Sequence, residues 1–493
     1  MRGEIKVTLV SNRGPVTFVR SGHGFETKRG AGGLAGALDP VARRLGDGAI
    51  WIAAATSESD RHAKHEGRVG SLRSLLGYEV ELLDIEPGTY QDYYDVVSNR
   101  MLWFANHCLW KEVGLGGFGA REVEAWHRAY VPVNEIFARA AVERSDRDTL
   151  ILIQDYHLSV APRLIRERAP DRTIGHFTHS SFCGKPGLQV LPEPIPKSVI
   201  DGMLGADLLG FHVADWANGF MDCCEWVGAD VDRSSGRVTH RGRTSWVRTY
   251  PIPIDAAALR DRASRAEPAA WEARFEAGWT HGPPGPGHLV VRADRSEPSK
   301  NIVRGFEAFG SLLDRRPDLR QTARFLACVY PSRQSMPEYR AYSERILASV
   351  EEVNARHPGS IRLQLDDEFD RTLAALRIYD VLLVNPIMDG MNLVSKEGPS
   401  INRRGGSLVL SRGAGSFAEL GEHAVAIEDA LDVEATASAL ESALDMDAKE
   451  RARRATALRR VAESRRPEDW IEAQLADLGA IHEGAEPITP PPS

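Results

Sequence analysis

Short runs of β-branched and aliphatic residues recur along the chain, and longer segments with helical spacing of apolar residues separate most of them. Runs that are apolar throughout and alternate with helices predict parallel sheets covered on both faces. The helical spacing is clearest in residues 122–145. The predicted strands are 5–10, 49–54, 150–154, 173–179 and 207–213, and then 288–294, 323–331, 361–365, 381–385, 407–411 and 424–429.

The strands fall into two series, separated by a weakly patterned stretch, 264–288, with a Gly/Pro-rich core. A chain of 493 residues also exceeds the size at which one hydrophobic core usually stops growing. We therefore predict an α/β protein with two doubly wound domains, residues 1–250 and 251–480, whose last helix can pack back on the first domain. The Pro-rich tail, 481–493, is predicted to be disordered.

Composition narrows the functional classes. With 42% hydrophobic and 26% charged residues and a net charge of −8, the chain is typical of a globular protein and unlike a general nucleic-acid binder. Its five cysteines lack metal-ligand spacing, which predicts reduced thiols and no metal site. No apolar stretch is long enough for a membrane span or a signal core, so we expect a cytoplasmic protein without a membrane partner.

The segment "MDGMNLVSKE" (388–397) follows a predicted strand, 381–385. Asp389-Gly390 predicts a turn, and a helix is expected to begin near Asn392. The first amides of a helix have no intrahelical partner and lie at the positive end of its dipole. The backbone of Leu393 and Val394 is therefore a candidate phosphate cradle.

Two carboxylates flank this cradle. Asp389 could accept hydrogen bonds from sugar hydroxyls, and Glu397 could hold the two hydroxyls of a ribose. The alternative is an ordinary Asp-Gly turn with Glu397 paired to a lysine. Spacing alone leaves both interpretations open.

The loop "RSEPSK" (295–300) follows strand 288–294 and carries Arg295 and Lys300. Two cations at the carboxyl end of a parallel strand suit a diphosphate and could neutralise the charge on a departing nucleoside diphosphate. A surface loop with solvated charges is the alternative.

A glycine-rich segment, "RGAGGLAGAL" (29–38), contains the spacing of a dinucleotide fingerprint. That fingerprint requires a strand immediately before the glycines, and the predicted strand 5–10 ends far upstream. An NAD site is therefore disfavoured, whereas a glycine loop allowing close backbone approach to a ligand stays open. The chain has no GxxxxGK[ST] segment, which excludes a P-loop enzyme.

Polar residues also follow strands of the first series. Asp155 and His179 each come after an apolar run, where a parallel sheet is expected to bind ligands. A structural histidine is the alternative for His179.

Together these segments resemble the trehalose-6-phosphate synthase family, which are retaining glycosyltransferases (family 20) of the GT-B fold. The resemblance covers residues 5–480 and rests on motifs in the family's order: "SNR", "GAGGLAG", "YDVVSNRMLW", "QDYH", the His179 strand, "RSEPSK", "YPSR" and "DGMNLVSKE". It implies two Rossmann-like domains facing a central cleft.

The resemblance also implies site residues. For glucose 6-phosphate as acceptor, they are Arg13, Tyr94, Trp103, Asp155 and Arg333. For the nucleotide sugar, they are Gly32, Gly33, Arg295, Lys300, Asp366, Asp367, Phe369, Asp389, Gly390, Met391, Asn392, Leu393, Val394 and Glu397. The implied catalytic residues are His179, Asp155, Arg295, Lys300 and Asp389.

The implied reaction moves glucose from a nucleotide-glucose to glucose 6-phosphate with retention, as an α,α-trehalose-phosphate synthase does. The acceptor hydroxyl attacks on the face from which the diphosphate leaves, so neither a protein nucleophile, a metal nor a cofactor is required. The partners are then small-molecule substrates, and a homo-oligomer is compatible with the sequence.

The chain departs from the family pattern at "HSSFC" (179–183), where relatives carry two prolines. Some relatives are pseudo-glycosyltransferases, which couple a nucleotide-activated cyclitol to an amino-cyclitol phosphate, and they lose the tyrosine matching Tyr94 and alter "DGMNLV". Both features are intact here, which favours glucose. A non-catalytic sugar-phosphate sensor is a further alternative, which Arg295 and Lys300 disfavour.

The resemblance implies that residues 363–371 contact the nucleobase, and Asp366 and Asp367 lie there near Phe369. Guanine presents adjacent N–H donors, and a carboxylate can accept hydrogen bonds from two of them at once, whereas uracil offers a single N–H donor. This favours GDP-glucose and leaves UDP-glucose open. Two solvated loop acids are the alternative.

Overall fold

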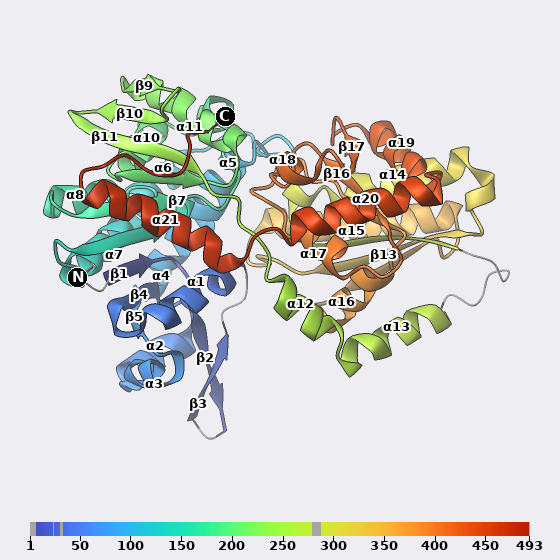
Figure 1. The fold of residues 1–493 in the computed structure, drawn as a ribbon, viewed down its shortest axis with the longest axis horizontal. Helices are drawn as coiled ribbons and strands as arrows, with labels where there is room; N and C mark the ends of the chain where they lie inside the picture. Colours follow the sequence, from blue (N-terminus) through green and yellow to red (C-terminus); the bar gives the residue numbers. More distant parts are fainter. Residues whose placement is uncertain (1–5, 23, 30–32, 279–286, 493) are drawn as a thin grey trace. The chain divides into compact units, whose positions relative to one another are not determined.

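Strands and helices alternate along the chain as the apolar pattern predicts (Figure 1). The computed structural model describes residues 6–22, 24–29, 33–278 and 287–492. It divides into two units, the first made of Met1–Lys111, Leu115–Ile252 and Pro467–Ser493, and the second of Glu112–Gly114 and Pro253–Arg466. The main division thus falls beside the predicted boundary.

Unit 1 is built on a nine-stranded sheet in the order β5-β4-β1-β6-β7-β8-β11-β10-β9, plus a separate β2-β3 hairpin. All neighbouring strands are parallel except at β10, which runs antiparallel to β9 and β11. The strands are β1 (Lys6–Val10), β2 (Val16–Ser21), β3 (Gly24–Arg29), β4 (Ala49–Ala54), β5 (Glu79–Leu83), β6 (Thr149–Gln154), β7 (Thr173–Phe177), β8 (Leu208–Phe211), β9 (Asp230–Asp232), β10 (Arg237–His240) and β11 (Arg243–Thr249).

The helices of unit 1 include a long π-helical segment, η3, and the last helix of the chain, α21. They are α1 (Gly33–Leu45), α2 (Glu58–His65), α3 (Leu72–Leu76), α4 (Pro87–Gln91), η3 (Asp92–Trp103), α5 (Phe104–Asn106), α6 (Ala120–Ala125), η4 (Trp126–Tyr130), α7 (Val131–Glu143), α8 (Ala161–Arg168), α9 (Lys185–Leu188), α10 (Ile195–Met203), α11 (Ala214–Cys224) and α21 (Pro467–His482).

The helix α21 packs on α1 and on β6, β7 and β8. After it, the amides of Ile488 and Thr489 donate to the buried carboxylate of Asp477, at 2.6 and 2.9 Å. These two bonds tie part of the segment predicted to be disordered, 481–493, to a buried acceptor on α21, and Ser493 lies outside the described residues.

Unit 2 contains a six-stranded, fully parallel sheet in the order β14-β13-β12-β15-β16-β17. Its strands are β12 (His288–Arg295), β13 (Ala323–Tyr330), β14 (Ile361–Leu365), β15 (Val381–Val384), β16 (Ser407–Ser411) and β17 (Val425–Ile427). Its helices are α12 (Ala256–Ala263), α13 (Ala266–Gly278), α14 (Ile302–Arg315), α15 (Pro337–Arg356), α16 (Phe369–Ile378), α17 (Val394–Ile401), α18 (Phe417–Leu420), α19 (Val433–Leu444) and α20 (Ala448–Ala462).

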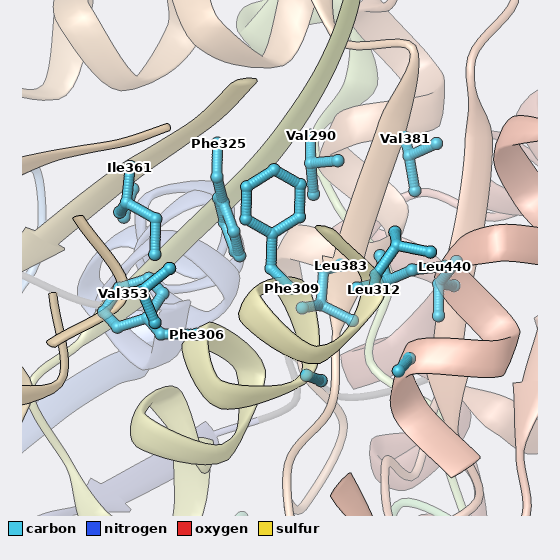
Figure 2. Packing of buried hydrophobic residues seen from close by; sticks show 14 of the residues in the cluster. Val290, Phe306, Phe309, Leu312, Phe325, Val353, Ile361, Val381, Leu383 and Leu440 are labelled. Atoms are coloured by element: carbon cyan, nitrogen blue, oxygen red, sulfur yellow. The ribbon is translucent and has the colours of Figure 1, made fainter. Parts of the chain in front are cut away.

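Two apolar clusters cover the two faces of this sheet, as expected for strands buried on both sides. In one of them, Phe306 and Phe309 of α14 contact Phe325 of β13 edge-on, both at 5.3 Å between ring centroids (Figure 2). Such aromatic pairs add roughly 0.5–1.5 kcal/mol each beyond their buried area. The packing holds β12, β13, β14 and β15 in place, and the candidate site residues of unit 2 lie at the carboxyl ends of these strands and in the segments that follow them.

The pattern missed β5, the β2-β3 hairpin and the β9–β11 region, which are edge strands or carry exposed charged residues. In the described part of the chain, no helix has the length and apolar character that a membrane span requires.

Candidate functional site

An ion pair joins the loops after β12 and β15, which are neighbouring parallel strands. Lys300 Nζ donates to Asp389 Oδ2 at 2.5 Å, and both side chains are largely buried. Burial lowers the pKa of Lys300. The carboxylates of Asp389, Glu297 and Asp294 outweigh that effect, so the pKa lies above its ordinary value and the ammonium keeps its charge.

Glu297 is the centre of a second charge cluster. Its Oε1 lies 3.5 Å from Arg295 Nε and 3.6 Å from Arg333 Nη1. Burial favours a raised pKa for Glu297, but Arg295, Arg333 and Lys300 lower it to about 2. The ionised Glu297 therefore anchors Arg295, whose side chain is 51% exposed and accessible to a ligand. Sequence reasoning missed Glu297, although an acid between two cations in "RSEPSK" was the signal.

Behind this loop lies a buried arginine that sequence reasoning also missed. Arg292 is fully buried on β12 and donates to Asp294 Oδ2 at 2.8 Å and to the carbonyl of Lys300 at 2.9 Å. The backbone that carries Lys300 is thus fixed from inside the unit.

The Asp389-Gly390 turn rests on the loop after β16. The amide of Asp389 donates to Gly413 O at 2.9 Å, and the amide of Gly415 donates to Asp389 O at 3.1 Å. A Cβ atom at Gly415 would overlap the carbonyl of Gly390, so this close approach requires glycine. The glycines of "RGAGS" (412–416) were the signal for this second loop.

Asn392 decides where the next helix starts. Its φ is 67°, its Nδ2 donates to Asp389 Oδ2 at 3.0 Å, and its Oδ1 accepts the amide of Ser395 at 3.2 Å. The regular helix α17 therefore begins at Val394, two residues after Asn392. Leu393 and Val394 still supply the first amides of that helix. Met391 is buried, which leaves only its backbone for ligand contact.

Glu397 lies one turn into α17 and is partly buried. Burial alone raises the pKa of this carboxyl to about 7. A carboxyl with such a pKa changes charge near neutral pH, which is a common property of ligand-binding sites.

The two acids expected at the nucleobase differ in their contacts. Asp366 accepts two hydrogen bonds from the guanidinium of Arg371, at 2.5 and 3.1 Å. Asp367 is exposed, and Phe369 opens α16 with 47% of its surface exposed. Asp367 and Phe369 could therefore contact a nucleobase as they stand, whereas Asp366 would first have to give up its ion pair with Arg371.

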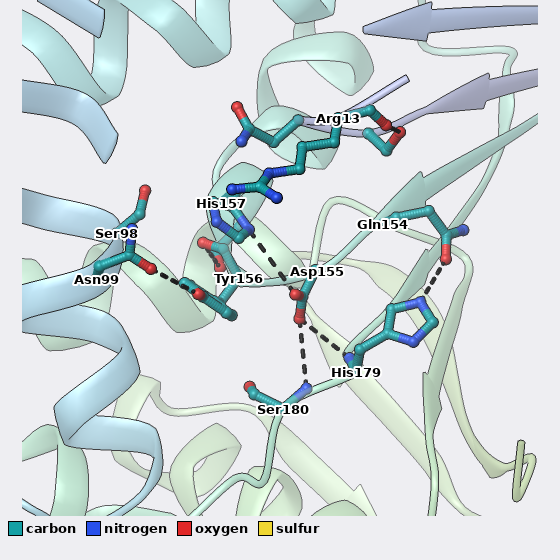
Figure 3. Close-up of polar contacts among 12 residues, drawn as sticks. Arg13, Ser98, Asn99, Gln154, Asp155, Tyr156, His157, His179 and Ser180 are labelled. Carbon is teal, nitrogen blue, oxygen red and sulfur yellow. Dashed lines mark hydrogen bonds and ion pairs between the residues drawn. The ribbon is translucent and has the colours of Figure 1, made fainter. Parts of the chain in front are cut away.

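In unit 1, Asp155 holds the loop that carries His179 (Figure 3). Asp155 follows β6 with an uncommon φ of 72°, and its Oδ1 accepts the amides of His179 and Ser180, at 3.1 and 3.4 Å. Non-glycine residues with positive φ store strain and are enriched at functional sites. Asp155 and His179 follow β6 and β7, which are neighbouring parallel strands.

His179 is neutral and fixed in orientation. Burial, with smaller contributions from His212 and His176, holds its pKa well below the ordinary value. Its Nε2 lies 2.9 Å from Gln154 Oε1, as Figure 3 shows. An amide oxygen can only accept, so Nε2 carries the proton. The ring also packs near Trp470 of α21, at 5.7 Å between centroids, a contact that the sequence did not indicate.

Arg13 and Tyr94 form a second polar group in unit 1. Arg13 Nη2 donates to Tyr94 Oη at 2.8 Å, and the tyrosine ring stacks on His157 at 5.7 Å between centroids. His157 Nδ1 lies 3.7 Å from Asp155 Oδ2. Arg13, Tyr94 and Asp155, separate in sequence, are thus linked through His157.

Trp103 ends η3 and is buried against His107, with ring centroids 4.1 Å apart. Arg333 lies in unit 2, where Nη1 donates to Tyr339 Oη at 2.6 Å. The residues that the sequence predicted to bind the acceptor substrate therefore belong to both units.

The glycine loop is only partly described. Gly33 is the first residue of α1, whereas Gly32 lies outside the described residues. The apolar pattern missed a strand that lies nearer to the glycines than residues 5–10, because β3 ends at Arg29. However, β3 pairs antiparallel with β2 in a hairpin and does not belong to the parallel sheet, so the context of a dinucleotide fingerprint is still missing.

The prediction of reduced thiols is wrong for one pair. Cys108 and Cys183 form a disulfide between segments 75 residues apart. Cys183 ends the "HSSFC" loop, whose Cys183 amide and Ser181 hydroxyl donate to Asn106 O, at 3.0 and 3.1 Å. The disulfide is a long-range link that residue spacing could not reveal.

Chemically, unit 2 offers cations and helix amides for a diphosphate, and unit 1 offers a guanidinium, a carboxylate and a neutral imidazole for a sugar. Among the described residues, no group of three or more His, Cys, Asp or Glu side chains could hold a metal ion.

The profile of glycosyltransferase family 20 matches residues 5–480, nearly the whole chain. The chain belongs to glycosyltransferase family 20. The resemblance and the GT-B type α/β fold predicted from the sequence are therefore confirmed.

Within family 20, trehalose-6-phosphate synthase of Mycobacterium sp. (strain KMS) is 32% identical over 99% of this chain and 97% of that protein. Validamine 7-phosphate valienyltransferase of Streptomyces hygroscopicus subsp. jinggangensis is 29% identical over 88% of this chain and 86% of that protein. A Burkholderia xenovorans α,α-trehalose-phosphate synthase (UDP-forming), solved with glucose-6-phosphate, has a TM-score of 0.79 at 24% identity, covering 96% of this chain and all of that one. At that identity the structural likeness shows the fold alone.

Proposed function

We propose that this protein transfers glucose, with retention, from a nucleotide-glucose to glucose 6-phosphate, forming α,α-trehalose 6-phosphate. The observation that carries the proposal is the Lys300–Asp389 pair beside the amide end of α17. A leaving diphosphate needs cations and amides at one point, and a transferred sugar needs a hydroxyl-binding carboxylate next to them.

In this proposal Arg295 and Lys300 bind the diphosphate together with the amides of Leu393 and Val394. Lys300 keeps its charge, and Arg295 is anchored by the ionised Glu297. The two cations therefore offset the charge that develops as the glycosidic bond breaks.

The sugar and the ribose are bound by the remaining groups of the turn. Asp389 and neutral His179 hold hydroxyls of the transferred glucose, with Gly390, Met391 and Asn392 contributing backbone contacts. Glu397 holds the ribose hydroxyls. Gly32 and Gly33 complete the approach to the nucleotide sugar.

The acceptor is bound by Arg13, Tyr94, Trp103, Asp155 and Arg333. Arg13 and Arg333 are the phosphate partners, since a guanidinium binds phosphate through two parallel hydrogen bonds. Asp155 is already oriented by the amides of His179 and Ser180.

The reaction requires one bond to break and one to form on the same face of the glucose. The acceptor hydroxyl attacks the anomeric carbon as the diphosphate leaves, and a leaving oxygen takes the hydroxyl proton. Catalysis then depends on positioning and charge stabilisation by Arg295 and Lys300, without a protein nucleophile.

We favour GDP-glucose over UDP-glucose. The exposed carboxylate of Asp367 can accept two N–H donors of guanine, and the exposed Phe369 ring beside it offers a stacking surface. Asp366 supports the loop through Arg371.

A second candidate function is cyclitol transfer to an amino-cyclitol phosphate, favoured by the relative named as a validamine 7-phosphate valienyltransferase and by the "HSSFC" loop. Tyr94 and the unaltered "DGMNLV" segment favour glucose instead.

The deciding experiment incubates the purified protein with GDP-glucose, UDP-glucose and ADP-glucose, with and without glucose 6-phosphate, and follows nucleoside diphosphate release and the sugar product. Acceptor-dependent release with trehalose 6-phosphate as product supports the proposal. Release only with a cyclitol phosphate would establish the second candidate, and binding without release from any pair would leave a sugar-phosphate sensor.

A further inference from the structure

Unit 2 contains a cavity of about 600 Å³ that the proposed function does not use. The end of α12, the residue Tyr379 before β15, the segment 399–406 and α20 line it. Its volume lies within the range of small-molecule sites.

This cavity lies at the opposite end of the sheet from the groups proposed to bind the nucleotide sugar. Tyr379 and Gly406 come immediately before the parallel strands β15 and β16, whereas Asp389 comes after β15. A four-residue strand separates its ends by roughly 13 Å. The cavity is therefore a separate site.

Four arginines line the cavity, and no aspartate or glutamate appears among the described residues of its wall. Two of the four have structural contacts. Arg377 donates to Ala263 O and pairs with Glu272 at 2.6 Å, and Arg459 donates to the carbonyls of Pro399 and Asn402.

The other two arginines are more open. The side chain of Arg260 is 49% exposed and has an ion pair with Glu463. The side chain of Arg403 is 61% exposed, and its Nη2 lies 3.7 Å from Glu272. Each guanidinium has five N–H donors, so these contacts leave donors for an anion.

Whereas the arginines of the wall supply hydrogen-bond donors, its hydroxyl groups supply acceptors. Ser264 donates to Asp261 O at 2.7 Å, Thr456 to Ala452 O at 2.8 Å and Ser400 to Glu463 at 3.0 Å. Because each hydroxyl proton is used, each oxygen is left with the capacity to accept a hydrogen bond. Such a wall suits a ligand that carries one anionic group and several hydroxyl donors.

We propose that this cavity is a second binding site for a sugar phosphate, with Arg260 and Arg403 on the phosphate and the oxygens of Ser264 and Thr456 on the sugar hydroxyls. Guanidinium pairs are well suited to phosphate monoesters. The carboxyl end of α17 lines the cavity, and the amino end of the same helix carries the proposed diphosphate cradle.

The test is calorimetric titration of glucose 6-phosphate, trehalose 6-phosphate, inorganic phosphate and glucose into the full-length protein. The titrations use wild type and Arg13→Ala, each with and without the double substitution Arg260→Ser/Arg403→Ser. Arg13→Ala weakens phosphate binding at the proposed acceptor site. The control is Arg265→Ser/Arg453→Ser, which removes two arginines of similar exposure, near α12 and on α20, that pair with Asp261 and Glu450. In the Arg13→Ala background we expect a sugar phosphate to bind. Adding Arg260→Ser/Arg403→Ser should weaken this binding at least about tenfold, and adding the control substitutions should leave it unchanged.

Inorganic phosphate binding as tightly as both sugar phosphates, or glucose binding equally well, would overturn the assignment to a sugar phosphate. An unchanged isotherm in Arg260→Ser/Arg403→Ser would overturn the site itself. A selenate soak of wild-type crystals gives a readout that needs no variant, and the anomalous peak is expected between Arg260 and Arg403. None of these outcomes depends on turnover, so failure of the proposed transferase activity is scored separately.

Discussion

Lys300 and Asp389, 89 residues apart in sequence, form an ion pair of 2.5 Å between the loops that follow β12 and β15. With a single contact, the pair orients a cation and the carboxylate that is proposed to bind the transferred sugar. Asn392 donates to the same carboxylate oxygen, so the pair is linked to the start of α17.

We predict that Lys300→Ala lowers kcat by about 100- to 1000-fold, because a preorganised charge at a leaving group has that effect. The assay is nucleoside diphosphate release under saturating substrates, after thermal unfolding has shown that the variant is folded. The control is Lys6→Ala, which breaks an exposed pair with Asp146 at 2.8 Å and is expected to leave stability and activity nearly unchanged. Full activity of Lys300→Ala would remove the leaving-group assignment.

The raised pKa of Glu397 predicts a pH-dependent stability. Its carboxyl titrates near 7 in the folded protein and at 4.5 when unperturbed. The protonated carboxyl therefore contributes fully to the free energy of unfolding below pH 4.5. This contribution is lost as the pH rises through about 7, and the loss is at most about 3 kcal/mol. Glu397→Gln should remove this slope.

The measurement is the unfolding free energy of the ligand-free protein between about pH 5 and pH 8. Wild type should lose stability relative to Glu397→Gln across this range, and Glu422→Gln, at an exposed glutamate, should follow wild type. Parallel curves for wild type and Glu397→Gln would contradict the burial argument.

For Arg13→Ala we predict a 10- to 100-fold higher KM for glucose 6-phosphate with a smaller change in kcat, since hydrogen bonds to charged groups contribute about 1.5–3 kcal/mol. Steady-state kinetics with the acceptor varied would measure it. Arg20→Ala, at an exposed arginine of the β2-β3 hairpin, is the control and should leave both constants unchanged. A rise in the KM of the nucleotide sugar instead would move Arg13 to the other substrate.

The choice of nucleobase is expected to depend on Asp367. Asp367→Ala should reduce the ratio of kcat/KM for GDP-glucose over UDP-glucose by about tenfold, because it removes paired acceptors for guanine. The companion variant Asp366→Ala breaks the ion pair with Arg371 and should lower both kcat/KM values together. An unchanged ratio in Asp367→Ala would exclude this carboxylate from base recognition.

The Cys108–Cys183 disulfide predicts a redox-dependent stability of unit 1. Thiol titration of denatured protein should find three free thiols before reduction and five after it, since Cys223, Cys224 and Cys328 are unpaired in the structure. Reduction should lower stability by about 2–4 kcal/mol.

The same reduction should also raise the KM for the acceptor, because the disulfide ends the loop whose amides at His179 and Ser180 orient Asp155, a proposed acceptor residue. Reductant should have no effect on Cys108→Ser/Cys183→Ser, which is the control. A wild-type protein with five thiols before reduction would contradict the pairing.

The sequence by itself determined the α/β class, the strand series and the loops that carry Arg295, Lys300 and Asp389, because these depend on the local spacing of apolar, glycine and charged residues. It also identified the family from motifs in order. Asp155 and His179 were found for the same reason, as polar residues directly after buried strands.

Only the tertiary structure decided which of these residues meet. The Lys300–Asp389 pair, the ion pair of Arg333 with Glu297, the contact of Trp470 with His179 and the Cys108–Cys183 disulfide all join distant segments. Such contacts follow from the order of strands in a sheet and from the helices that cover it, and this order results from the packing of the whole unit. Local spacing carries no information about it.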